Sequence, residues 1–287
     1  MPARLRQRVL QALGAERLHL AKEAAEQAAG RVPVFAQVNF LSATQATEAA
    51  HEAGEAGAAA LAMAVPRLVG FGETDLYRYF DRILSSIDIP LLIQDWNPLG
   101  PTVSARFGSD LHRAHPHFRW IKLEEPLMSA KVSAILEATG GEVGVLEGWG
   151  GMYMLVLIPG GICGVMPGLA VSDLLVRVFQ LATQGDMAGA HQIYAAVLPQ
   201  IVFSLQHLEL FHHAEKRPLG ARGILADPVV RDLILSLDRY VEDRIAFLNQ
   251  QGPRRARPAG AAAKSRSNRR RVQTSLTLSR AESIRSS

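Results

Sequence analysis

The sequence predicts an α/β protein in which parallel strands form an incomplete (β/α) barrel of the TIM type, followed by C-terminal helices. From Glu16 onward, helical periods alternate with short β-branched runs, which is the pattern of βα units around a parallel sheet. An apolar content of 48% over 287 residues is enough to bury one sizeable core. We find six strands, whereas eight close such a barrel, so we expect its first part to be missing.

The expected elements follow one another in a regular order. They are a helix over 16–29, a strand over 32–38, a helix ending at Gly57, a strand over 58–65, a helix over 75–86, strands over 89–94 and 119–123, a helix over 130–138, and strands over 143–146 and 162–166. Ser42 or Thr44 can cap the second helix, because a side-chain oxygen there accepts a free backbone N–H. Amphipathic helices near 171–184, 188–209 and 227–249 would pack outside the sheet or form an oligomer contact.

The two ends of the chain differ from its body. We leave residues 1–14 unassigned, and we assign 15–250 to the partial barrel with its helical extension. Residues 251–287 are predicted to be a disordered basic tail, because they have too few large apolar side chains to offset the entropy of ordering. Ten of the 31 Lys and Arg residues lie in that tail. Its Arg269–Arg271 cluster could bind nucleic acid, but no aromatic residue lies between the bases, and we favour a solvated tail.

The sequence also bounds the compartment of the protein. Cys163 is the only cysteine, so an intramolecular disulfide is impossible, and its apolar neighbours suggest a small buried side chain. No stretch is long enough and apolar enough to span a bilayer. We therefore expect a soluble cytoplasmic protein that does not engage a membrane.

Polar residues that close the apolar runs are the candidates for chemistry, because active sites of parallel barrels form at the C-terminal ends of the strands. They are Gln37 and Asn39, Gln94 and Asp95, Lys122 with Glu124 and Glu125, and Glu147 before the turn Gly148-Trp149-Gly150-Gly151. Amides of such a turn can hold a carboxylate or phosphate, although a tight strand-to-helix turn is the more frequent role.

Lys122 is the central candidate. Strand alternation points it away from Ile121 and Leu123, toward the barrel interior or its rim. Burial there would lower the pKa of the amine and free it to form an imine with a ketone. The alternative is an ion pair with Glu124, which lies on the same strand face and would keep the amine charged. Because adjacent carboxylates point to opposite faces, at most one of Glu124 and Glu125 reaches the site.

We expect no metal site. The histidines form two groups, His112, His115 and His117, then His207, His212 and His213. Neither group has a cysteine or carboxylate at a spacing typical of zinc, so solvated histidines are favoured.

From about Glu16 to Asn249 the order of elements and the local motifs resemble the dihydrodipicolinate synthase and N-acetylneuraminate lyase family of class I aldolase-like lyases. The segments that carry the resemblance are 28–34, 52–58, 89–93, Ile121-Lys122 and Gly164-Val165-Met166. The resemblance implies that the strands are the third to eighth of a barrel whose first two are missing. It also implies that Lys122 is the Schiff-base lysine, that no other cofactor is used, and that the backbone near Met166 contacts a bound 2-oxo acid.

The sequence departs from the family pattern in three places. The fifth strand of the family ends in a tyrosine that relays protons, and Gln94-Asp95-Trp96 stands here instead. The arginine with which the synthases grip their second substrate is not found in 97–101, so we do not expect lysine biosynthesis. The glycine and hydroxyl motif of the second strand has no counterpart. A catalytically inactive small-acid-binding barrel, or a truncated fragment, is therefore the alternative to an enzyme.

The hypothesis from the sequence is a lyase or aldolase that acts on a pyruvate-type 2-oxo acid or a sugar acid, as a homo-oligomer. Lys122 would form the imine, and Gln94 or Asp95 would handle protons or substrate hydroxyls. The expected substrate-binding residues are Met166, Gly148, Glu147, Asn39 and Glu124.

Overall fold

The computed structural model describes residues 14–67, 70–97, 100–231 and 235–255, and it describes the side chains of all of these except 14–15 and 251–255. Residues 1–13 and 256–287 hold most of the unassigned segment and most of the predicted basic tail, so those predictions lie outside the described residues.

Six parallel strands form a half-barrel, in the order in which they occur along the chain. They are β1 (Phe35–Gln37), β2 (Ala60–Ala64), β3 (Leu91–Trp96), β4 (Phe118–Glu124), β5 (Gly144–Glu147) and β6 (Gly164–Val165). The predicted six-stranded parallel α/β sheet is therefore confirmed. Because consecutive strands pair in parallel, all of their C-terminal ends meet at one edge, which is where a site can form.

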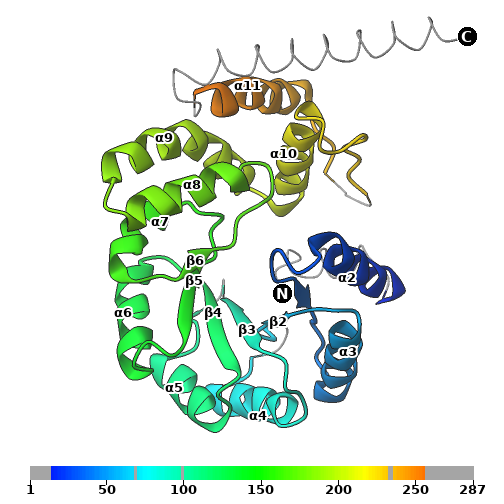
Figure 1. Cartoon of the computed structure of the whole chain (residues 1–287), viewed down its shortest axis with the longest axis vertical. Helices are drawn as coiled ribbons and strands as arrows, with labels where there is room; N and C mark the ends of the chain where they lie inside the picture. Colours follow the sequence, from blue (N-terminus) through cyan, green and yellow to red (C-terminus); the bar gives the residue numbers. More distant parts are fainter. Residues whose placement is uncertain (1–13, 68–69, 98–99, 232–234, 256–287) are drawn as a thin grey trace, which may run out of the picture.

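Helices cover the convex face of this sheet (Figure 1). They are α3 (Ala43–Glu55), α4 (Glu73–Leu84), α5 (Ala105–Ala114) and α6 (Met128–Ala138), while α2 (Gly14–Ala28) lies beside α3 at the β1 edge of the sheet. Ser42 is the N-cap of α3, since its side chain accepts from the Gln45 N–H, and this settles the choice between Ser42 and Thr44. Helix α5 was not among the predicted elements, although the Ser104 side chain caps it through the Phe107 N–H at 3.1 Å.

The C-terminal third is helical, as predicted, but with different boundaries. It comprises α7 (Met154–Leu157), a 3-10 turn at Ile158–Gly160, α8 (Ser172–Thr183), α9 (Met187–Ser204), α10 (Leu208–Ala221) and α11 (Arg239–Arg255). The predicted helix over 188–209 covers α9 and only the start of α10, which is a separate helix because His207 is extended and caps it with its own side chain. The predicted helix over 227–249 begins only at Arg239, and it continues to Arg255, beyond the expected start of the tail.

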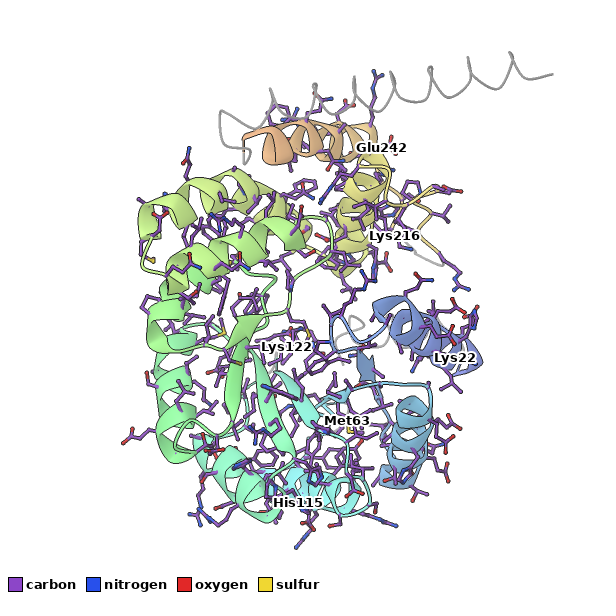
Figure 2. The ribbon with its side chains drawn as sticks, viewed as in Figure 1. Lys22, Met63, His115, Lys122, Lys216 and Glu242 are labelled. Carbon is purple, nitrogen blue, oxygen red and sulfur yellow. The ribbon has the colours of Figure 1, made fainter. Side chains whose placement is uncertain are left out.

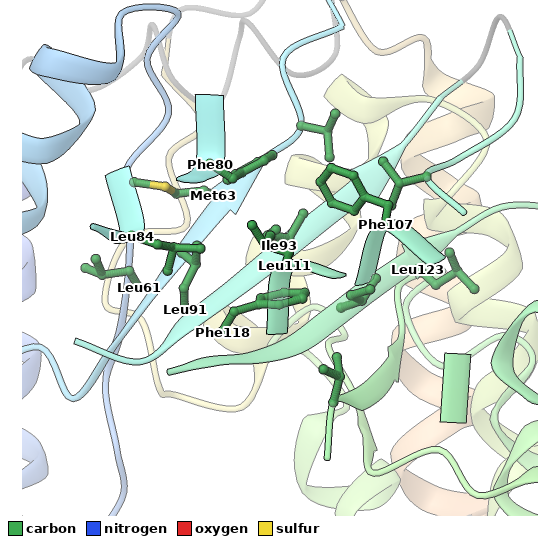
Figure 3. Packing of buried hydrophobic residues seen from close by; sticks show 14 of the residues in the cluster. Leu61, Met63, Phe80, Leu84, Leu91, Ile93, Phe107, Leu111, Phe118 and Leu123 are labelled. Carbon is green, nitrogen blue, oxygen red and sulfur yellow. The ribbon is translucent and has the colours of Figure 1, made fainter. Parts of the chain in front are cut away.

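Residues on the convex face of the strands form the core with these helices (Figure 3). Ile121 and Leu123 of β4 are fully buried there, beside Ile93 of β3. Phe80 of α4 meets Phe107 of α5 edge to face, with ring centroids 6.3 Å apart. Each such fully buried side chain stabilises the fold by about 1.5–3 kcal/mol. The strand residues between them must point the opposite way, so the packing of this core fixes what the concave face presents.

The concave face is polar in its middle. The register pairs Gln37 with Ala62, and Gln94 with Lys122. Ala62 leaves room between the longer side chains of β1 and β3, and the start of α10 lies across this side of the sheet. Among the described helices, none combines the length and the apolar composition that a membrane crossing requires.

Candidate active site

A cavity of about 270 Å³ lies on the concave side, at the C-terminal ends of the strands. It is lined by Phe35, Gln37, Ala62, Gln94, Trp96, Lys122, Glu124, Gly148, Trp149, Gly150, Met166, Pro167, Gly168, Ser204, Leu205, His207, Leu208 and Phe211. All six strands of the sheet contribute a residue, either directly or through the segment that follows them. The volume is near the lower end of what small-molecule sites offer, so a small ligand fits best.

Lys122 lies in this cavity, at the centre of the molecule (Figure 2). Its neighbours Ile121 and Leu123 are held in the core, so Lys122 points to the other face of β4, where it is 6% exposed. Its Nζ donates to Oε1 of Glu124 at 2.7 Å. The ion pair that the sequence allowed as an alternative role therefore exists. A carboxylate at this distance is positioned to accept a proton from the lysine.

Glu124 is the junction of a row of polar side chains. Its Oε1 also accepts from Nε2 of Gln94 at 2.5 Å. The Oε1 of Gln94 in turn accepts from Nε2 of Gln37 at 3.3 Å. An ionised Glu124 carboxylate can only accept hydrogen bonds, so the Gln94 side chain must turn its NH2 group toward Glu124. This leaves the Gln94 oxygen to accept from Gln37. Four polar side chains from three strands thus lie side by side on the cavity wall.

Glu125 points to the other face of the sheet. Its Oε2 accepts from the Thr102 hydroxyl and lies 3.9 Å from Nζ of Lys131. Only Glu124 of the two adjacent glutamates lines the cavity, which confirms the prediction that at most one of them reaches the site.

Asp95 does not line the cavity, which corrects the expectation that it handles protons there. It is fully buried on the convex side, paired with Nη2 of Arg67 at 2.9 Å, and its Oδ2 accepts from the Val103 N–H at 2.5 Å. Burial raises the pKa of Asp95, while the hydrogen bonds and charge of Arg67 act against this rise. The reason is strand alternation: Gln94 faces the cavity, so its neighbour cannot.

Asn39 and Glu147 also lie away from the cavity wall, although both were expected to bind substrate. Oδ1 of Asn39 accepts from the Ala64 N–H at 2.8 Å and so extends the pairing of β1 with β2. Glu147 is 1% exposed and binds the backbone of the turn that follows β5. In contrast, Gly148 and Met166 line the cavity, as Gln94 and Glu124 do.

Two backbone N–H groups of the glycine turn after β5 bind the carboxylate of Glu147. The Gly151 N–H donates to Oε2 of Glu147 at 2.6 Å, and the Tyr153 N–H donates to Oε1 at 3.3 Å. These two amides are therefore not available to an external anion, and the turn itself forms part of the cavity wall. The sequence allowed this segment to be either an anion site or a tight strand-to-helix turn, and these two amides have the second role.

Several cavity residues were not singled out from the sequence as substrate-binding residues. They are the aromatic side chains Phe35, Trp96, Trp149 and Phe211, and Ser204 and His207 from the α9–α10 junction. His207 was considered only as a metal ligand, and here its Nδ1 accepts from the Glu209 N–H at 3.2 Å. Phe35 lies on the same strand face as Gln37, and Trp96 on the same face as Gln94, so alternation is a signal for these two residues. No local pattern marks Ser204, His207 and Phe211, because they reach the cavity only through tertiary packing.

The described residues contain no group of three or more His, Cys, Asp or Glu side chains arranged to hold a metal ion. His112 and His117 instead contact the backbone carbonyls of Phe118 and Leu84, and His115 contacts Asp81 at 2.8 Å.

Comparisons with known proteins agree with this fold. Residues 11–103 match the dihydrodipicolinate synthetase family. The L-2-keto-3-deoxyarabonate dehydratase of Azospirillum brasilense is 27% identical over 191 residues, which cover 65% of this chain and 62% of that protein. This chain therefore spans less than two thirds of the length of that curated relative.

Solved structures show the same fold at low sequence identity. The dihydrodipicolinate synthase of Rhodopseudomonas palustris is 22% identical, with a TM-score of 0.75 over 84% of this chain and 81% of that one. YagE of E. coli K12, a prophage protein of the dihydrodipicolinic acid synthase family solved in complex with pyruvate, is 20% identical, with a TM-score of 0.72 over 86% of this chain and 84% of that one.

Proposed function

We propose that the chain is a member of the dihydrodipicolinate synthase family of lyases and aldolases, and that it cleaves, forms or dehydrates a 2-oxo acid through an imine on Lys122. One observation carries the proposal. The Lys122 amine is almost fully buried in a polar cavity, with the Glu124 carboxylate 2.7 Å away. A buried lysine beside a proton acceptor is the arrangement that imine chemistry requires.

The proposed reaction uses Glu124 as the proton carrier. Glu124 takes a proton from the Lys122 ammonium, and the free amine adds to C2 of the oxo acid. The former ketone oxygen then takes up that proton and a second one and leaves as water, which produces a protonated imine. Glu124 next removes a proton from C3, and the electron pair moves into the imine to give an enamine. General acid–base transfer of this kind contributes about 10²–10⁴ in rate.

The enamine can then react in two ways. Addition of C3 to an aldehyde, or the reverse cleavage, is an aldol reaction, whereas loss of a hydroxyl from C4 with a proton is a dehydration. In both cases water hydrolyses the imine and restores Lys122. Because a relative is named as a dehydratase of a 2-oxo sugar acid, we propose dehydration of such an acid as the first activity to test.

The remaining cavity residues support binding of a hydroxylated substrate. Gln37 and Gln94 present amide groups, and Ser204 and His207 face them from the α9–α10 junction. Met166, as the resemblance implied, and Gly148 would line the oxo-acid part. Lys122 is the only Lys or Arg among the described residues that line this cavity. We therefore propose that the substrate carboxylate binds mainly to N–H and O–H donors.

Trapping with borohydride tests the proposal. Wild-type protein, Lys122→Arg and Lys131→Arg are each incubated with pyruvate and with sugar-derived 2-oxo acids, reduced, and measured by intact mass. Lys131 is the matched control, because it is a partly buried lysine held by Thr102 and Val103 on the convex side. We expect a reduced adduct on wild type and Lys131→Arg, and none on Lys122→Arg. Thermal stabilisation by these acids without any adduct would instead identify an inactive acid-binding barrel.

A further inference from the structure

Glu147 is a buried carboxylate that the proposed reaction does not use. It ends β5 and is 1% exposed, with its side chain away from the cavity. Burying a carboxylate is costly, and an apolar side chain would fill the same space without that cost. A carboxylate at this buried position therefore calls for a role that depends on its two oxygens.

Both oxygens of Glu147 bind the backbone of the following turn. Oε2 accepts from the Gly151 N–H at 2.6 Å and Oε1 accepts from the Tyr153 N–H at 3.3 Å. Between these points the chain reverses at Gly150 and Gly151, whose φ angles are +68° and +91°. These angles favour glycine, and they allow the turn to fold back onto the end of its own strand.

The turn held in this way is a wall of the active site. Gly148, Trp149 and Gly150 all line the cavity. The backbone of Gly148 lies directly against Glu124, since a Cβ added there would overlap with Cγ of Glu124 and lie 2.7 Å from the Leu123 carbonyl oxygen. The position of the turn therefore limits where the Glu124 carboxylate can be, and hence how it meets Lys122.

The outer side of the turn is supported by the C-terminal helices. The Tyr194 hydroxyl of α9 donates to the carbonyl of Met152. A Cβ at Gly151 would lie 3.0 Å from Cδ1 of Leu175 in α8. The turn is thus held between Glu147 on one side and α8 and α9 on the other.

We propose that Glu147 is a positioning residue, which fixes Glu124 against Lys122 by holding the turn 148–153 in place. This inference rests on the proposed function and extends it to a residue that does not touch the substrate. Burial raises the pKa of Glu147 to about 7, while the N–H donors of Gly151 and Tyr153 and the charge of Lys122 act against the rise. The Tyr194 side chain also interacts electrostatically with Glu147.

Rates of imine trapping with pyruvate test this role. Glu147→Leu removes both acceptors, whereas Glu147→Gln keeps an acceptor for the Gly151 N–H. Asp95→Asn is the matched control, because Asp95 is also a buried carboxylate at a strand end that accepts a backbone N–H, from Val103, but holds no part of the cavity wall. With saturating pyruvate, we expect Glu147→Leu to trap about tenfold more slowly or worse, since small misplacements cost this much. Glu147→Gln should recover most of the rate, and Asp95→Asn should keep it.

The outcomes separate this inference from the function on which it rests. An adduct on wild type together with an unchanged rate in a folded Glu147→Leu protein would overturn the positioning role alone. A wild-type protein that forms no adduct would overturn the imine proposal. If Glu147→Leu shows no cooperative melting, Gly151→Ala disturbs the same turn with Glu147 in place, and the same loss of rate is expected. A wild-type rate in Gly151→Ala would then contradict the positioning role.

Discussion

Nζ of Lys122 and Oε1 of Glu124 lie 2.7 Å apart on the concave face of β4, with the cavity in front of them and the hydrophobic core behind. The same carboxylate oxygen is held from the next strand by Gln94 at 2.5 Å. A lysine and a carboxylate in this contact can exchange a proton without moving, which is the basis of the proposed imine chemistry.

Glu124→Gln should slow imine formation by about 10²-fold, because the amide cannot take the proton from Lys122. Glu125→Gln is the control, since Glu125 lies on the opposite face beside Thr102 and Lys131. The measurement is the rate of borohydride-trapped adduct at saturating pyruvate. If both variants trapped at the wild-type rate, Glu124 would have no part in proton transfer.

Gln94→Leu should lower the trapping rate by less, about tenfold, because Glu124 keeps its contact with Lys122 but loses the donor that orients it. Gln37→Leu, one step further along the row, should have a smaller effect on the rate. The rates are measured at saturating pyruvate, so that a loss in proton transfer is not confused with weaker binding of pyruvate. A larger loss of trapping rate in Gln37→Leu than in Gln94→Leu would contradict the order in which Gln37, Gln94 and Glu124 are hydrogen-bonded.

Asp95→Asn should lower the free energy of unfolding by about 3 kcal/mol, because Arg67 loses a buried charge partner while the Val103 N–H keeps an acceptor. Urea unfolding gives this value, and the imine trapping rate should stay near that of the wild type. Should the trapping rate fall while the stability stays unchanged, the assignment of Asp95 to the convex scaffold would be wrong.

Glu147 should make stability depend on pH. Its pKa rises on folding from 4.5 to about 7, so the folded protein binds more protons than the unfolded chain between these values. Protonation of Glu147 therefore favours the folded state, and its contribution to the free energy of unfolding is complete below about pH 4.5. This contribution, about 3 kcal/mol at most, is lost as the pH rises through 7. Urea unfolding of wild type and Glu147→Gln at pH 5 and pH 8 tests this. The variant should gain stability relative to wild type at pH 8, and an equal difference at both values would contradict the shift.

The sequence predicted the sheet well because its signals are local. Each strand is a short apolar run, and strand alternation alone correctly predicted that the Lys122 side chain points away from those of Ile121 and Leu123. The same rule separates Gln94 from Asp95, since adjacent strand residues cannot both face the cavity, but it does not say which one does.

The rest of the site depends on contacts that no local pattern encodes. Glu147 binds amides four and six residues further on, which requires the turn geometry of Gly150 and Gly151. His207 and Phe211 reach the cavity from α10, far along the chain from Lys122. The break between α9 and α10 depends on the extended conformation of His207, which the apolar periodicity around it does not reveal.

Peptide mapping after borohydride reduction in the presence of pyruvate tests the central claim most directly. The protein is reduced, digested and analysed by tandem mass spectrometry, and every lysine is compared with and without pyruvate. The account predicts a reduced pyruvyl adduct on Lys122 and an unmodified Lys131. An unmodified Lys122 under conditions in which the folded protein binds the acid would contradict it.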